Sequence, residues 1–109
     1  MEVPTLHPLI RQHEKIIAAL CRRYDVLRLD VFGSVLSSDF DPAHSDVDLT
    51  VEFDPAATGS GLNRYFDLKR DLESVLGRSV DLVELSAMPD TRLKRSIARS
   101  KIPLYAATT

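Results

Sequence analysis

The sequence predicts a small mixed α/β (α+β) domain, in which helices pack on one face of a single mixed β-sheet. The chain has 109 residues, enough for one small domain. Its 44% hydrophobic and 28% charged residues are typical of a soluble globular protein. Segments with the three- and four-residue apolar spacing of helices alternate with segments that have the two-residue spacing of strands. We therefore expect residues 1–109 to form one domain.

The N-terminal third predicts a helix followed by a strand. Apolar residues recur on one face from about Thr5 to Tyr24, with Pro8 in the first turn, where proline is tolerated. From Val26 to Phe32 apolar residues alternate with Arg28 and Asp30, which is typical of a strand with one apolar face. Gly33-Ser34 ends this pattern.

The middle of the chain predicts a second strand and a long helix. Residues 35–45 and 54–61 are rich in loop-forming residues. Between them, Asp46 to Phe53 alternates strictly between apolar and polar side chains. Leu62 to Leu76 is expected to be a helix ended by Gly77. Its expected buried stripe is Leu62, Tyr65, Phe66, Leu72, Val75 and Leu76.

The C-terminal part predicts a strand, a helix and a short edge strand. Ser79 to Leu85 is the strand, and Pro89 opens a helix through about Ser100, with Leu93 and Ile97 inward. Ile102 to Tyr105 is an edge strand, because Pro103 cannot donate a ladder hydrogen bond.

Charge and cysteine content exclude several classes of protein. The net charge of −2 argues against a general nucleic-acid binder. Cys21 is the only cysteine, so no internal disulfide forms. We see no signal peptide and no apolar run long enough to cross a membrane. These features predict a soluble cytoplasmic protein without a membrane or direct nucleic-acid partner.

Gly33-Ser34 is a candidate phosphate-binding turn. Glycine allows close backbone approach, and backbone N–H groups at such a turn suit phosphate oxygens. The Ser34 hydroxyl can add a hydrogen bond. Taken alone, a Gly-Ser pair after a strand is more often an ordinary turn.

Three aspartates are candidate metal ligands. Asp46 and Asp48 project from the same strand face, with Cα atoms about 6.5–7 Å apart. Carboxylates at this spacing suit Mg²⁺ or Mn²⁺. Asp81 lies between Val80 and Leu82 in the later strand, on the face opposite these apolar residues. Each aspartate taken alone is more simply an exposed strand residue.

The order of these features resembles the nucleotidyltransferases of the DNA polymerase β superfamily. The stretches VFGSVLSSDFDPAHSDVDLTVEF and SVDLVEL carry the resemblance, which covers roughly residues 10–105. The chain length resembles the minimal nucleotidyltransferases (MNT), many of which are antitoxins paired with a HEPN-domain toxin.

The resemblance implies a site, a reaction and a partner. Asp46 and Asp48 would bind two Mg²⁺ ions, with Mn²⁺ as a substitute, and Asp81 would complete the catalytic metal site and help to deprotonate the attacking hydroxyl. Gly33 and Ser34 would hold the triphosphate of ATP. AMP would pass to a tyrosine hydroxyl of a HEPN toxin in a hetero-oligomer.

Two departures leave alternatives open. The family often has a small residue, Arg and Gly where this chain has Leu36, Ser37 and Ser38, and the spacer from Ser34 to Asp46 holds eleven residues, where ten is commoner. One alternative is an antitoxin that neutralises its partner by binding alone. Another is transfer to a small molecule such as an aminoglycoside.

Other chemically active side chains receive structural interpretations. Asp39, Asp41 and His44 are expected to be solvated loop residues, and His7 and His13 lack companions with metal-ligand spacing. Cys21 is expected to be a small buried hydrophobe. Five basic residues are expected to form a solvated helix face: Arg92, Lys94, Arg95, Arg99 and Lys101. The alternative is that they contact a nucleotide or an acidic partner.

Overall fold

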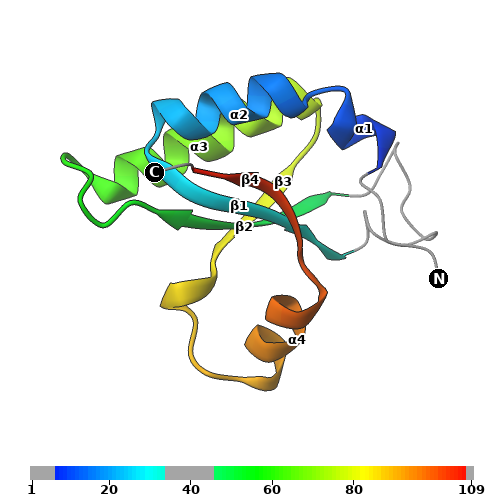
Figure 1. The fold of residues 1–109 in the computed structure, drawn as a ribbon, viewed down its shortest axis with the longest axis vertical. Coiled ribbons are helices and arrows are strands. Elements are labelled where there is room, and N and C mark those ends of the chain that lie inside the picture. The colour runs from blue at the N-terminus through cyan, green and yellow to red at the C-terminus, as the bar shows by residue number, and fades with distance from the viewer. Residues whose placement is uncertain (1–6, 34–45, 108–109) are drawn as a thin grey trace.

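A four-stranded sheet in the order β3-β2-β1-β4 organises the described part of the chain, residues 7–33 and 46–107 of a computed structural model (Figure 1). The strands are β1 (Val26–Phe32), β2 (Val47–Phe53), β3 (Val80–Glu84) and β4 (Ile102–Ala106). The α-helices are α1 (Pro8–Arg11), α2 (Glu14–Arg23), α3 (Gly61–Leu76) and α4 (Arg92–Ser100). A short 3-10 helix, η2 (Leu85–Ala87), follows β3. The expected order of helices and strands is confirmed.

The sheet is mixed, as the sequence predicts. β1 is antiparallel to both β2 and β4, whereas β2 and β3 are parallel. Parallel neighbours need a crossover connection, and α3 is that connection. Pro103 lies on the edge strand β4, where its missing N–H is tolerated.

The hydrophobic core lies between the sheet and two helices. Figure 1 shows α2 and α3 side by side across one face of the sheet. Burying the apolar sides of these elements supplies most of the stabilisation of the fold. Core residues from the helices are Ile17, Cys21, Leu68, Leu72 and Leu76, and those from the strands are Val26, Leu29, Val31, Val47, Leu49, Val51, Val80 and Leu82.

The opposite face of the sheet is covered in part by α4. This helix lies on the side away from α2 and α3 (Figure 1). The Thr91 side chain caps its N-terminus by accepting a hydrogen bond from the Lys94 N–H at 3.2 Å. Ile97 is buried as expected, whereas Leu93 is 62% exposed, so the inward position expected for Leu93 is wrong.

The first helix is interrupted, which corrects the single helix expected up to Tyr24. α1 ends at Arg11 and α2 begins at Glu14. At the break, the His13 N–H donates to Ile10 O, and the His13 ring Nδ1 lies 2.8 Å from Leu9 O. The ring nitrogen therefore contacts the Leu9 carbonyl oxygen, which in a continuous helix would accept a hydrogen bond from the His13 backbone N–H.

The buried stripe of α3 differs at its N-terminal end from the expected one. Ser60 caps the helix, and Gly77 ends it in the left-handed conformation at φ 66°. Leu68 is buried, but Leu62 and Phe66 are 67% and 55% exposed. These two side chains, predicted to be core, instead line an open apolar hollow beside β3.

Side chains from α3 close the outer edge of β3. Glu73 Oε2 accepts a hydrogen bond from the Val80 N–H at 3.0 Å, and the Tyr65 hydroxyl donates to Leu82 O at 2.5 Å. An open strand edge presents unpaired N–H and C=O groups to other chains. Here Glu73 and Tyr65 of α3 form hydrogen bonds with two of these groups, the Val80 N–H and the Leu82 carbonyl.

None of the helices in the described segments has the length and apolar character needed to cross a lipid bilayer.

Candidate active site

The sheet places two of the predicted carboxylates next to each other. Asp48 on β2 is the register partner of Asp81 on β3 in the parallel pair. Neighbouring strands are about 4.8 Å apart, and register partners project from the same face. The neighbouring core residues, Leu49 and Leu82, are buried, so both aspartates belong to the face opposite the core. The strand order supplies this juxtaposition, which the sequence pattern alone does not determine.

Gly33 packs directly against Asp48. β1 and β2 pair Phe32 with Asp48, which brings the residue after β1 over the start of β2. A Cβ atom added to Gly33 would lie 2.1 Å from Asp48 Oδ2. Gly33 also has φ +79°, a conformation that residues with side chains rarely adopt. Two independent constraints therefore require glycine at this position.

Of the other predicted site residues, Asp46 lies within the described part of the chain and Ser34 does not. Asp46 is exposed and immediately precedes β2. Ser34 and the loop from Val35 to Ser45, including Asp39, Asp41 and His44, lie outside the described residues. In residues 7–33 and 46–107, no three His, Cys, Asp or Glu side chains converge closely enough to hold a metal ion. The assignment of Asp46, Asp48 and Asp81 as metal ligands thus stays a prediction.

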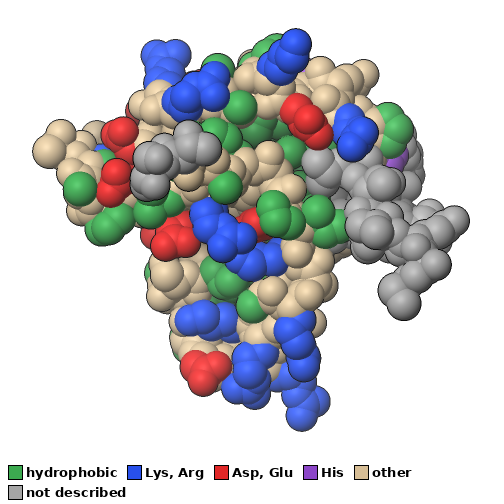
Figure 2. All heavy atoms as spheres, viewed as in Figure 1, with side chains coloured by type: hydrophobic (Ala, Val, Ile, Leu, Met, Phe, Trp, Pro, Cys, Tyr) green, Lys and Arg blue, Asp and Glu red, His purple; other side chains and the backbone are tan. Residues whose placement is uncertain are grey.

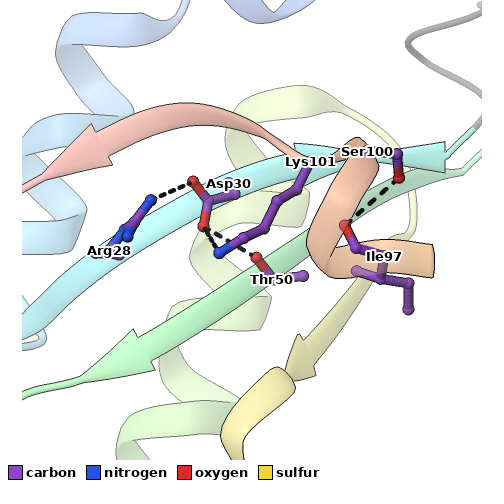
Figure 3. Close-up of polar contacts among 6 residues, drawn as sticks. All are labelled: Arg28, Asp30, Thr50, Ile97, Ser100 and Lys101. Carbon is purple, nitrogen blue, oxygen red and sulfur yellow. Dashed lines mark hydrogen bonds and ion pairs between the residues drawn. The ribbon is translucent and has the colours of Figure 1, made fainter. Parts of the chain in front are cut away.

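A buried acid at the centre of the same face was not singled out from the sequence. Asp30 on β1 is only 2% exposed. Its Oδ2 accepts hydrogen bonds from Lys101 Nζ at 3.0 Å and from Thr50 Oγ1 at 3.3 Å, as Figure 3 shows. Arg28 Nη2 lies 3.6 Å from Oδ1, which is an ion pair without a hydrogen bond. The sequence carries no distinct signal for it, because Arg28 and Asp30 both occupy polar positions of an alternating strand.

Lys101 reaches this acid from the junction of α4 and β4. Figure 3 shows its side chain pointing across the sheet toward Asp30, between the two strands that carry Asp30 and Thr50. The ammonium group is thereby fixed on the site face, so Lys101 differs from the solvated helix residue expected from the sequence. A buried carboxylate requires such a partner, because an isolated buried charge is strongly unfavourable.

A polar hollow of about 230 Å³ opens beside Asp30. Its polar lining consists of Asp30, Thr50, Glu52, Ser86, Lys94 and Lys101. Thr50 follows Asp48 by two residues on β2, so it lies on the same face about 7 Å further along the strand. The polar hollow is therefore a neighbour of the carboxylates.

An apolar hollow of about 510 Å³ lies at the outer edge of β3. Leu62, Tyr65 and Phe66 of α3 form one wall, and Leu82 and Val83 contribute to the other. Burial raises the pKa of the Tyr65 phenol, and the carboxylates of Asp81 and Glu84 raise it further. Tyr65 is therefore protonated, as its hydrogen bond to Leu82 O requires.

The other chemically active side chains considered from the sequence have structural roles or lie on the surface. His7 caps α1 by accepting a hydrogen bond from the Leu9 N–H at 3.0 Å. Cys21 is fully buried, and burial raises the pKa of its thiol to about 12. The expectation of a buried small hydrophobe is thus confirmed for Cys21. Lys and Arg side chains gather on the lobe formed by α4 (Figure 2), and Arg92, Arg95 and Arg99 are exposed there.

Comparison with protein families gives a match over most of the chain. Residues 13–104 match the model of the nucleotidyltransferase domain. The protein MJ1379 of Methanocaldococcus jannaschii, assigned as a protein adenylyltransferase, is 32% identical over 94 residues, which cover 86% of this chain and 89% of that protein. MJ0128 of the same organism, with the same assignment, is 31% identical over 100 residues, covering 92% and 95%.

Solved structures show the same fold. A structure described as a minimal nucleotidyltransferase superposes with a TM-score of 0.68 and 34% identity, covering 86% of this chain and 91% of that chain. A toxin–antitoxin structure with AMP-PNP gives 0.64 and 26%, covering 86% and 73%. The complex of a tri-AMPylated Shewanella oneidensis HEPN toxin with an MNT antitoxin gives 0.62 and 25%, covering 90% and 73%. With its fold, its paired aspartates and these relatives, the chain belongs to the nucleotidyltransferase domain family and is a nucleotidyltransferase.

Proposed function

We propose that this protein is a metal-dependent adenylyltransferase that transfers AMP from ATP to a hydroxyl group of a HEPN toxin and thereby acts as its antitoxin. The observation that carries the proposal is the register pair Asp48 and Asp81 on one sheet face, with Gly33 packed against Asp48. The assignment of its relatives as protein adenylyltransferases supports AMP as the transferred group. The tri-AMPylated HEPN toxin bound to an MNT antitoxin supports the choice of partner.

Asp46, Asp48 and Asp81 would hold the metal ions in this proposal. Their donors are carboxylate oxygens only, which suits Mg²⁺ or Mn²⁺ rather than a softer metal. The side chains would have to turn toward a common point, because they do not converge in the described structure. When bound, two such ions polarise the attacking hydroxyl and neutralise charge on the leaving pyrophosphate.

The residues of the chain would position the reactants. Backbone N–H groups at the turn that begins with Gly33 would bind phosphate oxygens, and Ser34 would add a hydroxyl donor. The acceptor oxygen attacks the α-phosphorus, the bond from that phosphorus to the bridging oxygen breaks, and pyrophosphate leaves. Asp81 is exposed on the same face and would accept the proton of the hydroxyl. We propose a tyrosine as the acceptor residue.

A transfer assay tests this function. The protein is incubated with α-labelled ATP, Mg²⁺ and its HEPN toxin, and label on the toxin is measured. Label should appear with the wild-type protein and vanish with Asp48→Ala and Asp46→Ala. Asp90→Asn is the matched control, since Asp90 is an exposed carboxylate paired with Arg95 of α4, and it should leave labelling unchanged.

Neutralisation by binding alone is the second candidate, and the atypical Leu36, Ser37 and Ser38 favour it. In that case the Asp46→Ala and Asp48→Ala variants of the protein would still suppress toxin activity, and the wild-type protein would transfer no label to the toxin. That pair of results would exclude the catalytic function. Labelling of an aminoglycoside instead of the toxin would exclude the protein acceptor.

A further inference from the structure

The outer surface of α4 carries positive charge, and the helix has no acidic residue of its own. Its basic residues are Arg92, Lys94, Arg95 and Arg99, in a chain whose net charge is −2. Because an α-helix completes a turn in about 3.6 residues, the three arginines lie along one side of α4 and the buried Ile97 lies on the other. Figure 2 shows Lys and Arg side chains gathered on this lobe. We call the exposed row of Arg92, Arg95 and Arg99 the arginine stripe.

Two arginines of the stripe have no carboxylate beside them. Arg95 Nη1 lies 3.2 Å from the Asp90 carboxylate. Arg92 and Arg99 are exposed and form no ion pair with any residue that the structure describes. A guanidinium group binds a carboxylate through two parallel hydrogen bonds, a geometry that lysine lacks. Arg92 and Arg99 therefore offer two binding groups for carboxylates of another molecule.

The arginine stripe belongs to the helix that covers the site face of the sheet. Figure 1 shows α4 on the side away from α2 and α3. Lys94 of α4 and Thr50 of β2 line the same polar hollow, and Thr50 lies about 7 Å along β2 from Asp48. A protein that presents a hydroxyl group to Asp48 and Asp81 therefore comes close to α4.

A protein with acidic side chains fits this surface better than a nucleic acid does. α4 has no aromatic side chain on which a base could stack. Leu93, next to Arg92, is 62% exposed, and it offers an apolar contact that suits a protein surface and not a phosphate backbone. Arginine is also enriched at protein–protein interfaces, whereas lysine is depleted there.

We propose that the arginine stripe and Leu93 form the surface on which the acceptor protein docks, and that this protein presents an acidic segment near its acceptor hydroxyl. Carboxylates of that segment bind the guanidinium groups of Arg92 and Arg99, and an apolar side chain covers Leu93. These contacts hold the hydroxyl at the sheet face and select the acceptor among hydroxyl-bearing proteins. The inference rests on the proposed function, because it takes the acceptor to be a protein.

The double variant Arg92→Glu with Arg99→Glu tests the docking surface. The KM for the HEPN toxin and the KM for ATP are measured in the labelling assay with the full chain. Arg11→Glu with Arg22→Glu is the matched control, because these are exposed arginines of α1 and α2 and the change in net charge is the same. Arg92→Lys with Arg99→Lys keeps the charge without the guanidinium geometry, and Leu93→Gln removes the apolar contact.

The docking surface predicts a loss confined to the toxin. The KM for the toxin should rise at least about tenfold in the Glu variant and about threefold in Leu93→Gln, with the Lys variant between wild type and the Glu variant. The kcat and the KM for ATP should stay within about twofold of wild type. The control variant should match wild type. Raising NaCl from about 50 to about 300 mM should increase the KM for the toxin more steeply in wild type than in the Glu variant.

Three outcomes would overturn the docking surface while the proposed function stands. The first is a Glu variant with the wild-type KM for the toxin, and the second is an equal rise of that KM in the control variant. In the third, a fluorescent single-stranded RNA binds the wild type and not the Glu variant, with the KM for the toxin unchanged, which would assign the stripe to nucleic acid. A wild-type protein that transfers no label contradicts the proposed function itself, and toxin affinities of the same variants, measured by calorimetry, then decide whether the toxin docks on this surface.

Discussion

Gly33 and Asp48 are in such close contact that a methyl group on Gly33 would overlap the Asp48 carboxylate, with 2.1 Å between Cβ and Oδ2. This contact joins the end of β1 to the start of β2 and leaves no room for a side chain. The conformation of Gly33 adds a second constraint, because its φ is +79°. The following prediction separates these two constraints.

Gly33→Ala should reduce adenylyl transfer about a hundredfold, because the new methyl group displaces Asp48 by more than a few tenths of an ångström. Gly59→Ala is the control. Gly59 has φ +94° but nothing within 4 Å of an added Cβ, so it should lose only about 1 kcal/mol of stability and no activity. The checks are the toxin-labelling rate and the free energy of unfolding in urea. Equal activity of the two variants would show that the contact with Asp48 is unimportant.

Lys101→Met should lower the free energy of unfolding by about 3 kcal/mol, because it removes the closest cation from a buried carboxylate. Lys101 Nζ lies 3.0 Å from Asp30 Oδ2, and the Asp30 side chain is 3% exposed. Lys69→Met is the matched control: its pair with Glu73 is half-exposed at 3.9 Å, so the loss should stay below about 1 kcal/mol. Urea unfolding measures both. Asp30→Asn in the Lys101→Met background should restore part of the loss.

Tyr24→Phe should destabilise the protein by about 1 kcal/mol at pH 7, because it removes a hydrogen bond between α2 and α3. The Tyr24 hydroxyl donates to Asp71 Oδ2 at 2.5 Å. This bond lowers the pKa of Asp71 and raises the pKa of Tyr24. Tyr105→Phe is the control, since the Tyr105 hydroxyl has no hydrogen-bond partner among the described residues.

The same pair predicts the pH dependence of the effect. Because Asp71 has a lower pKa in the folded state, its stabilisation is complete above the unfolded value of about 3.9 and is lost as the pH falls through the folded value. Because Tyr24 has a raised pKa, its stabilisation is complete below about pH 10 and is lost as the pH rises through the folded value. The difference in melting temperature between wild type and Tyr24→Phe should therefore shrink at both extremes. A difference that persists unchanged at a pH below the folded pKa of Asp71 would contradict the hydrogen bond.

The Cys21 thiol should resist alkylation at pH 8 in the folded protein. Burial raises its pKa to about 12, so almost no thiolate is present and reagents have no access. In urea the thiol should react at the ordinary rate. Because the pKa of this thiol is higher in the folded than in the unfolded chain, the free energy of unfolding should fall as the pH rises above about 8.5, where the thiol of the unfolded chain begins to ionise. Rapid labelling of Cys21 without denaturant would place the thiol outside the core.

The double variant Tyr65→Phe with Glu73→Ala should associate with itself at high concentration. It frees Leu82 O and the Val80 N–H at the outer edge of β3, and open edges pair with other chains. Sedimentation measures the change. The control is Ser74→Ala, an exposed position on the same helix, which should sediment as the wild type does.

Features encoded by local pattern could be predicted from the sequence. The strict alternation in β2 indicates a strand with Asp48 on its polar face, and Gly77 indicates the end of α3 at the observed position. Ile97 is buried, as the helical spacing predicts. Each of these properties depends on neighbouring residues along the chain.

Features set by tertiary packing could not be predicted. Nothing in the local pattern determines that β3 lies beside β2, so the pairing of Asp48 with Asp81 depends on the strand order. Asp30 looks like an exposed strand residue until Lys101 and α4 cover it. Leu62 and Phe66 have the spacing of core residues, yet they line an open hollow beside β3 and stay exposed.

The pairing of Asp48 with Asp81 divides the assembly of the site into an early and a late part. Gly33 and Asp48 come from consecutive antiparallel strands, so their contact closes a short stretch of chain. Asp81 arrives only after α3 has crossed the sheet and delivered β3 to its place. Under the proposed function, a chain that has formed β1 and β2 but not docked α3 therefore has Gly33 and two of the three predicted metal ligands, Asp46 and Asp48, and lacks Asp81. Under the proposed function, loss of transfer activity should be the first sign that α3 has begun to detach from the sheet.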